Sequence, residues 1–393
     1  MIENKKTVIL SYLITVLPAT ISFYQLYVLY EIDIAVANIF YKNLSLILLL
    51  TSILALNTNY VYMLRVGNQV VKTKSEYTIL ALYRIFSYLI IVVPLIIIEN
   101  ETFSNSIKVI IFGLFKLLIE IVNNFFRAKN LLKDLQRSII LNALIDLIIL
   151  CGIFYFHLLD YYTGFILGYI IYISIIGNRI QPHLGLKDLK NTSSKIIKYY
   201  LEKIGPLSMS SIRENLSSQG VTYFSSSALN NNEYALLVNA IKIFSSGTIL
   251  LGVLSNYYMQ HIFRTGKRKF RDEILLTTAI GISLIFLKLI LSFTDYFEGV
   301  GNKISWFLIL LFYLGIILNL NYTIIQGLYL KNKNFLSLYL FEFSFIVTTL
   351  ICFKISAFET FFLSGFYSYL VSTLILILSY EFIHRRRTQR NSI

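Results

Sequence analysis

Long apolar runs separated by short polar connectors dominate the chain, and they predict helices that cross a membrane. A helix needs roughly 20 mostly apolar residues to span the hydrocarbon core of a bilayer. Twelve runs of suitable length lie at residues 9–29, 38–62, 78–98, 104–126, 138–156, 162–180, 204–229, 234–260, 274–294, 304–326, 335–355 and 361–382. We therefore expect an all-α integral membrane protein with twelve transmembrane helices.

The connectors alternate in charge along the chain. Basic residues gather at both termini, in the 2–3, 4–5, 8–9 and 10–11 loops, and in the connector at the middle of the chain. These segments hold 26 of the 35 Lys and Arg residues, whereas the other connectors hold three and are acidic. Cytoplasmic loops carry an excess of Lys and Arg, so we expect both termini to be cytoplasmic. Adding or removing one span would break this alternation.

The runs form two sets of six with matching spacing. Each run of the second set starts about 195 to 200 residues after its counterpart in the first. Both sets begin on the same side, so a repeat would be parallel, with its axis along the membrane normal. We predict an N-terminal six-helix bundle (1–180), a basic cytoplasmic connector (181–203) and a C-terminal six-helix bundle with a basic tail (204–393).

Composition narrows the classes of function. Only 14% of the residues are charged and 56% are hydrophobic, whereas soluble domains carry about a quarter charged residues. The net charge of +14 lies in short blocks between apolar runs, so we expect membrane lipids and no nucleic acid as partners. We find no Gly-rich phosphate loop, metal-ligand cluster or nucleophile elbow. We therefore expect a transporter with no catalytic residues, cofactor or metal.

Charged residues inside membrane spans are costly and mark functional sites. Lys116 and Glu120 lie one turn apart on one helix face; they either neutralise each other or line a wet cavity. Asp146 has no basic neighbour in its own span, so it needs a partner from another helix or a proton. Asp146, Glu120 and Glu214 are candidates for ion coupling. Arg84 either snorkels to the head groups or contacts the substrate.

The seventh run is too polar to face lipid on all sides. It is rich in serine and places Arg213 near the middle of the membrane, so its polar residues must face protein or water. Close helix packing would explain the serines, but not Arg213. Glu214 lies about 100° around the helix and is not expected to screen Arg213 fully. We predict that Arg213, Ser217 and Gln219 line a cavity, to which Lys242 adds positive charge. Such an interior suits an anionic substrate.

The segment 205–263 and the architecture of the whole chain resemble a known family. Gly205-Pro206 opens the polar seventh run, and a short turn at residues 230–234 leads into a helix that carries Lys242. This pattern is similar to that of the Wzx-type O-antigen and polysaccharide flippases of the MATE/MOP exporter superfamily. The chain departs from the family pattern at Ala235, where a glycine is usual. It also lacks a proline at 256–261 and glycines in the first span.

The resemblance implies a flippase in the bacterial inner membrane. Its substrate would be an undecaprenyl-pyrophosphate-linked oligosaccharide, moved from the cytoplasmic to the periplasmic leaflet by alternating access of two lobes. Arg213 would engage the pyrophosphate or the sugar, with Lys242, Lys116 and Arg84 as further contacts. The polymerase and the chain-length regulator of the same pathway would be its protein partners.

Two other functions fit parts of the sequence. An O-antigen polymerase, which is a membrane glycosyltransferase, has similar length and composition, but its class generally needs a long outward loop. The outer loops here are short. A small-molecule exporter is the second alternative, either of the same superfamily or of the two-bundle facilitator class. The facilitators usually carry a Gly-x-x-x-Asp-Arg-type 2–3 loop, which Arg65-Val-Gly67-Asn-Gln does not match.

Overall fold

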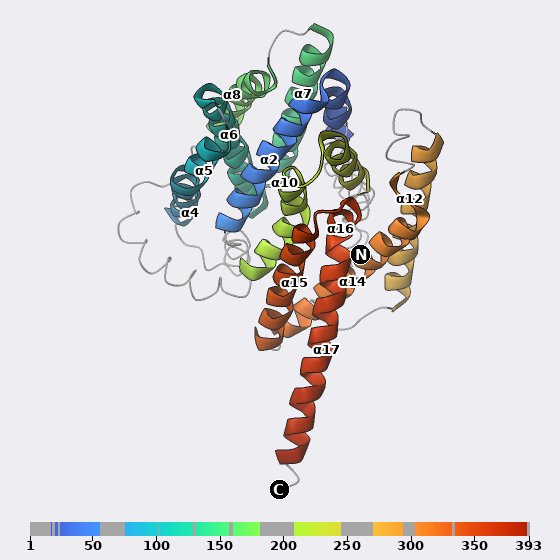
Figure 1. The fold of residues 1–393 in the computed structure, drawn as a ribbon. Coiled ribbons are helices and arrows are strands. Elements are labelled where there is room, and N and C mark those ends of the chain that lie inside the picture. The colour runs from blue at the N-terminus through green and yellow to red at the C-terminus, as the bar shows by residue number, and fades with distance from the viewer. Residues whose placement is uncertain are drawn as a thin grey trace. The chain divides into compact units, whose positions relative to one another are not determined.

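The structure is a computed structural model, and all regular elements in its described residues are helices (Figure 1). The described residues are 17, 20–22, 24–55, 75–100, 102–128, 131–156, 160–180, 208–244, 270–293, 303–331 and 335–390. The chain divides into two compact units, Met1–Asn215 and Leu216–Ile393. The predicted connector at 181–203 lies outside the described residues, so the predicted bundle boundary stays a prediction.

Unit 1 contains the predicted second to sixth spans. Its elements are a helix at residues 24–32, α2 (Ile34–Leu54), α4 (Ser75–Ser87), η1 (Tyr88–Val92), α5 (Val93–Glu99), α6 (Phe103–Ala128), α7 (Leu132–Phe156), α8 (Tyr161–Ile180) and a helix at 208–215. The π-helix η1 joins α4 and α5 into one span. Five segments of this unit are long and apolar enough to cross a membrane. Most of the predicted first span lies outside the described residues.

Unit 2 begins within the predicted seventh span. Its elements are the π-helix η3 (Leu216–Gly220), α10 (Val221–Ser225), a helix at residues 231–244, α12 (Phe270–Phe293), α14 (Trp306–Lys331), α15 (Phe335–Ile355), α16 (Phe358–Phe362) and α17 (Ser364–Arg390). Within α15, Leu336–Ile355 is long and apolar enough to span a membrane, and α14 and α17 contain shorter apolar segments. The end of the predicted eighth span lies outside the described residues.

Apolar side chains cover the outside of the helices, while charged side chains lie inside. Ile98 and Ile148 are 78% and 69% exposed, whereas Arg84 and Glu342 are buried. Water would penalise this arrangement, but lipid favours it because the hydrocarbon core offers no partner to polar groups. Together with the apolar helices, this distribution identifies a multi-pass membrane protein.

Ion pairs bring the acidic connectors of unit 1 together. Lys42 Nζ lies 2.9 Å from Glu99 Oε2, and Lys108 Nζ lies 2.8 Å from Asp160 Oδ2. Asp160 also begins α8, because its carboxylate accepts hydrogen bonds from the backbone N–H and the hydroxyl of Thr163. Partial burial raises the pKa of Asp160, but the bonds from Lys108 and Thr163 outweigh that effect and lower it.

The acidic connectors of unit 2 also meet. Asn230 caps the helix at 231–244, since its side-chain oxygen accepts a hydrogen bond from the backbone N–H of Glu233. Lys303 Nζ lies 3.6 Å from Glu233 Oε1 and 5.6 Å from the centre of the Phe358 ring. The 7–8, 9–10 and 11–12 connectors therefore lie together in this unit, as the alternation of spans requires.

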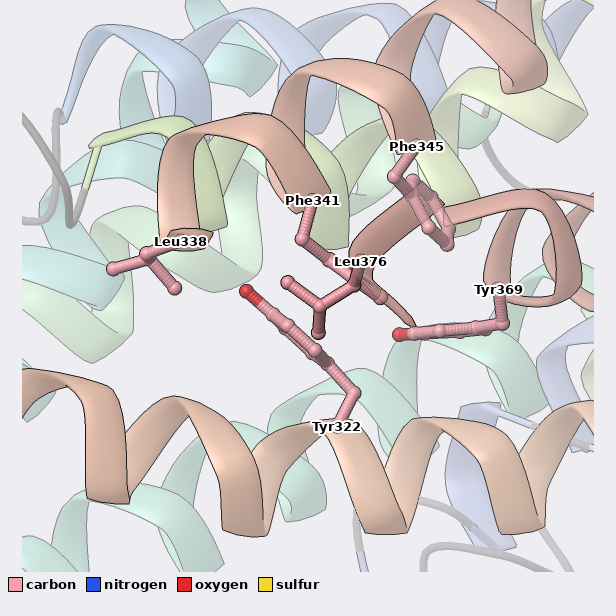
Figure 2. Packing of buried hydrophobic residues seen from close by; sticks show 6 residues of the cluster. All are labelled: Tyr322, Leu338, Phe341, Phe345, Tyr369 and Leu376. Atoms are coloured by element: carbon pink, nitrogen blue, oxygen red, sulfur yellow. The ribbon is translucent and has the colours of Figure 1, made fainter. Parts of the chain in front are cut away.

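An aromatic cluster joins α14, α15 and α17 (Figure 2). Tyr322 of α14 stacks on Phe341 of α15, with ring centres 3.5 Å apart, and Phe345 packs edge-on against Tyr369 of α17. The Tyr322 hydroxyl donates a 2.7 Å hydrogen bond to Glu342 Oε1. This carboxylate is buried among the helices.

The span formed by α4, η1 and α5 widens where it approaches Pro94. Proline has no N–H, and its ring clashes with the carbonyl one turn earlier; the preceding π-turn, closed by Val93 N–H to Tyr88 O, accommodates it. Tyr88 then points at α6 and donates a 2.7 Å hydrogen bond to Ile110 O. Gly113 leaves the space that the Tyr88 hydroxyl occupies.

We predict that Gly113→Ala destabilises unit 1. The new Cβ would meet the Tyr88 hydroxyl, and overpacking of this kind costs about 1–3 kcal/mol. The midpoint of thermal unfolding in detergent should fall. Because Tyr88→Phe removes the clashing oxygen, the double variant should lose less stability than the sum of the single variants. Additive losses would show that the clash is relieved elsewhere.

A second prediction concerns the sidedness of the membrane. In a Cys151→Ala/Cys352→Ala background, Ser104→Cys should react with a membrane-impermeant maleimide in intact spheroplasts, since the 3–4 connector is predicted to be periplasmic. Lys133→Cys should react only after the membrane is opened. Both positions are exposed, so accessibility reports sidedness. The reverse labelling pattern would overturn the predicted orientation.

Candidate functional site

The predicted site residues fall into three places along the two units. Four lie on the long helices of unit 1, where the structure brings two of them into an ion pair and the other two into a looser couple of opposite charges. Arg213 and Glu214 follow at the end of that unit, and the remaining three lie in unit 2. The residues are Arg84, Lys116, Glu120 and Asp146, then Arg213 and Glu214, then Ser217, Gln219 and Lys242.

The first couple joins Arg84 of α4 to Glu120 of α6. Arg84 Nη2 lies 2.9 Å from Glu120 Oε2, and Asn124 Nδ2 donates a 3.2 Å hydrogen bond to Glu120 Oε1. Arg84 is buried and does not reach a head group. Glu120 therefore balances a charge from a neighbouring helix, although Lys116 is its nearest basic residue in the sequence.

The second couple joins Lys116 of α6 to Asp146 of α7. The Lys116 ammonium interacts electrostatically with the Asp146 carboxylate. It also lies over two rings, 4.8 Å from the centre of Tyr169 and 5.7 Å from that of Phe112. Asn142 Nδ2 donates a 3.1 Å hydrogen bond to Asp146 Oδ2. The expected partner of Asp146 from another helix is thus Lys116.

Two residues beside Lys116 and Asp146 were not predicted as site residues. Asn142 stands four residues before Asp146, so the helical period could have shown from the sequence that both lie on one helix face. Tyr169 of α8 carries a hydroxyl that faces the Asp146 carboxylate. Tyrosine is abundant in this chain, with 29 residues, so only helix packing could single out Tyr169.

Arg213 lies in the helix at residues 208–215 and is 2% exposed. Its Nη2 lies 3.0 Å from Glu214 Oε1, and the Glu214 side chain is 64% exposed. We expected Glu214 not to screen Arg213 fully, and its carboxylate approaches one nitrogen of the guanidinium. The long side chains turn toward each other, so Glu214 partly neutralises Arg213 from the exposed side of the helix.

The same helix packs closely through serine. Ser210 and Ser211 are buried, and Ser211 Oγ donates a 3.3 Å hydrogen bond to the carbonyl of Ser52 in α2. Asn215 Nδ2 donates a 2.8 Å hydrogen bond to the Ser211 carbonyl. Small hydroxyl side chains therefore allow a close approach of backbones here.

The polar residues that follow lie on a π-helix. Ser217 and Gln219 belong to η3 and are half-buried. A π-turn is rare and is frequently found at functional sites, because it widens the helix and redirects side chains. Lys242 is also half-buried, in the helix at residues 231–244. A common role of Lys242 and η3 stays a prediction.

No metal cluster is evident among the described side chains. They include no group of three or more His, Cys, Asp or Glu that could hold a metal ion. The polar groups that they do offer are cations, carboxylates, amides and hydroxyls inside apolar helices. Such groups can bind a charged or hydroxylated solute and exchange partners during a conformational change.

Solved transporter structures share the fold of this chain. A multidrug resistance MATE family transporter of the MOP superfamily, in an outward-facing conformation, matches with a TM-score of 0.58 at 14% identity, over 95% of this chain and 94% of that one. A mutant of the Vibrio cholerae MATE transporter VcmN matches with a TM-score of 0.58 at 12% identity, over 95% of both chains. The chain therefore has the fold of MATE transporters.

A further match concerns the polarity of the binding pocket. A MOP superfamily transporter from Pyrococcus furiosus, whose reversed pocket polarity suggests a different function for it, matches with a TM-score of 0.50 at 13% identity, over 98% of both chains. No family model matches the sequence, and no curated protein matches it. The fold is thus the feature that these comparisons establish.

We predict that Glu120→Gln destabilises the protein, because it leaves the buried Arg84 without its carboxylate. Removing one partner of a buried ion pair costs about 3–5 kcal/mol. The Glu120 side chain is 38% exposed, which reduces the expected loss to about 1–3 kcal/mol. The loss should appear as a lower midpoint of thermal unfolding in detergent.

Two further variants make this test specific. The double variant Arg84→Met/Glu120→Met should recover most of the lost stability, since no charge is then left unpaired. Arg137→Gln alters an exposed cation of the same unit and should have almost no effect. Equal stability of Glu120→Gln and the wild type would rule out a stabilising role for the pair.

Proposed function

We propose that this protein is a Wzx-type flippase of the bacterial inner membrane. It moves undecaprenyl-pyrophosphate-linked O-antigen or polysaccharide repeat units from the cytoplasmic to the periplasmic leaflet by alternating access. The MATE transporter fold supports transport as the general activity. The polymerase and the chain-length regulator of the same pathway are its proposed protein partners.

The observation that carries this proposal is the burial of Arg213 in a serine-rich helix. An arginine inside a membrane protein requires partners and is retained at functional sites. Its planar guanidinium binds phosphate oxygens through two parallel hydrogen bonds. Glu214 approaches one nitrogen of this group from the exposed side, and an incoming pyrophosphate would compete with that carboxylate.

The other predicted residues have graded roles in the proposal. Ser217 and Gln219 supply neutral hydrogen bonds to sugar hydroxyls, and Lys242 adds positive charge. Lys116 and Arg84 are weaker candidates for direct substrate contact, because carboxylates in unit 1 already engage them. Asp146, Glu120 and Glu214 are the proposed groups for ion coupling, since each carries a carboxylate beside a cation, and the ion proposed for Asp146 is a proton.

Pocket polarity supports a substrate other than a cationic drug. The Pyrococcus furiosus transporter is an example in which reversed polarity of the pocket suggests a different function within one superfamily. The basic residues that we place in the interior of the predicted spans outnumber the acidic ones; they are Arg84, Lys108, Lys116, Arg213, Lys242 and Lys288 against Glu120, Asp146, Glu214 and Glu342. A cationic interior repels cationic solutes and attracts phosphate groups.

Export of a small molecule is the second candidate function. It is favoured by the likeness to a transporter described as a multidrug resistance protein. The two functions differ in the charge and size of the substrate. Expression in cells that lack their own exporters should not lower the accumulation of a fluorescent cationic dye if the flippase proposal is right.

The decisive test replaces Arg213 with Ala in a strain whose surface polysaccharide depends on this protein. We expect surface polysaccharide to fall at least tenfold, because the anionic head group loses its main cationic contact. Lipid-linked repeat units should accumulate on the cytoplasmic leaflet. Polysaccharide is measured by gel staining of cell extracts, and protein level and membrane insertion by immunoblotting of membrane fractions.

Matched variants separate binding from folding. Arg213→Lys keeps the charge but loses the planar fork, so partial activity is expected. Arg137→Ala removes an exposed arginine from the same unit and should leave polysaccharide unchanged. Normal polysaccharide in Arg213→Ala would reject the site. Normal polysaccharide after deletion of the whole gene would reject the function.

A further inference from the structure

We infer that the ammonium group of Lys116 is the built-in counter-cation of an oxygen site formed by Asp146, Asn142 and Tyr169. In the wild-type protein this tethered cation takes the place of a free alkali cation. Removing it should open a binding site for Na⁺ or Li⁺. The inference concerns unit 1 alone and does not depend on the identity of the transported substrate.

The oxygen atoms come from two adjacent helices. Asn142 and Asp146 stand one turn apart on α7 and are joined by the bond from Asn142 Nδ2 to Asp146 Oδ2. The buried atoms Asn142 Oδ1 and Asp146 Oδ1 accept no hydrogen bond of regular geometry, and the buried Tyr169 hydroxyl of α8 makes none either, although it faces the Asp146 carboxylate. Buried polar atoms of this kind normally have partners.

The Lys116 ammonium reaches this group from α6. Its charge acts on Asp146, and it lies over the ring of Tyr169, whose hydroxyl faces the same carboxylate. Glu120, one turn further along α6, is engaged by Arg84. Among the described residues, Asp146 is therefore the carboxylate that balances the charge of Lys116. The faces of the Phe112 and Tyr169 rings also stabilise the ammonium group.

The chemistry of these groups suits one monovalent cation. A carboxylate, an amide carbonyl and a phenol oxygen are hard ligands, and an ammonium group offers three donors and no acceptor. A second positive charge in the same space would be repelled, so the ammonium and an alkali cation exclude each other. Without Lys116 the buried carboxylate would need another cation or a proton.

The test measures alkali-cation binding by the purified full-length protein. Thermal unfolding in detergent can be followed with a maleimide dye, because Cys352 is buried and Cys151 is partly buried until the protein unfolds. NaCl and LiCl are titrated against choline chloride at constant ionic strength. The variants are Lys116→Met, which keeps the apolar stem, Lys116→Arg, which keeps the charge, and Lys116→Met/Asp146→Asn.

We expect a saturable rise of about 3–5 °C in the unfolding midpoint of Lys116→Met with Na⁺ or Li⁺, since a bound cation stabilises the folded state. The wild type, Lys116→Arg and the double variant should respond no more to NaCl than to choline chloride. A specific Na⁺ response of the wild type that Asp146→Asn abolishes would overturn the inference, as would a folded Lys116→Met that ignores both cations.

A double-mutant cycle provides a readout that does not depend on alkali cations. Asp146→Asn should lower the unfolding midpoint, because it leaves the half-buried ammonium of Lys116 without its carboxylate. Lys116→Met/Asp146→Asn should then be more stable than either single variant. If Lys116→Met fails to fold, recovery of folding in the double variant would still support the pairing. Additive losses, or no recovery, would contradict it.

Discussion

The structure of this protein depends on one constraint, which is that the hydrocarbon core of a membrane offers no partner to a charged or polar side chain. Each charge within a span must therefore be balanced by the protein itself. The described residues of unit 1 meet this requirement in pairs drawn from different helices, Arg84 with Glu120 and Lys116 with Asp146. The apolar side chains, which need no partner, cover the outside. Opposite charges on neighbouring helices thus accompany the apolar and aromatic core of this unit, and the closest such pair joins α4 to α6.

Irregular backbone occurs where polar or bulky groups must be accommodated between helices. The π-turn η1 precedes Pro94 and directs Tyr88 into the space left by Gly113. The π-turn η3 follows Arg213 and carries the serines and Gln219 of the predicted substrate path. A π-turn weakens a helix and persists when it serves packing or function. The first of these turns is explained by packing, and the second lies in the segment to which we assign a function.

Paired charges would have a direct use in the transport function that we propose. Alternating access requires helices that have two stable arrangements, and an ion pair that can exchange its partner supplies a difference in energy between them. Arg213 has a partner, Glu214, on its exposed side, so an anionic substrate could take that partner's place. The Lys116–Asp146 couple is more enclosed, since Asp146 Oδ1, Asn142 Oδ1 and the Tyr169 hydroxyl are buried and two aromatic rings lie beside Lys116. The partly exposed Arg213–Glu214 pair suits substrate binding, whereas the enclosed Lys116–Asp146 couple suits internal charge balance.

The sequence by itself determined the helical membrane class, the second to sixth spans and the grouping of the acidic connectors. The length of an apolar run and the charge of a loop are local properties, and they decide directly which segments lie in lipid and which in water. The sequence also showed that Asp146 needs either a partner from another helix or a proton. Only the tertiary structure decided which partners meet. Glu120 pairs with Arg84, 36 positions away, and not with Lys116 on its own helix face, and Arg213 turns to Glu214 despite their angular offset. Such choices depend on helix packing and on the rotamers of long side chains, and neither is encoded in the spacing of residues along one helix.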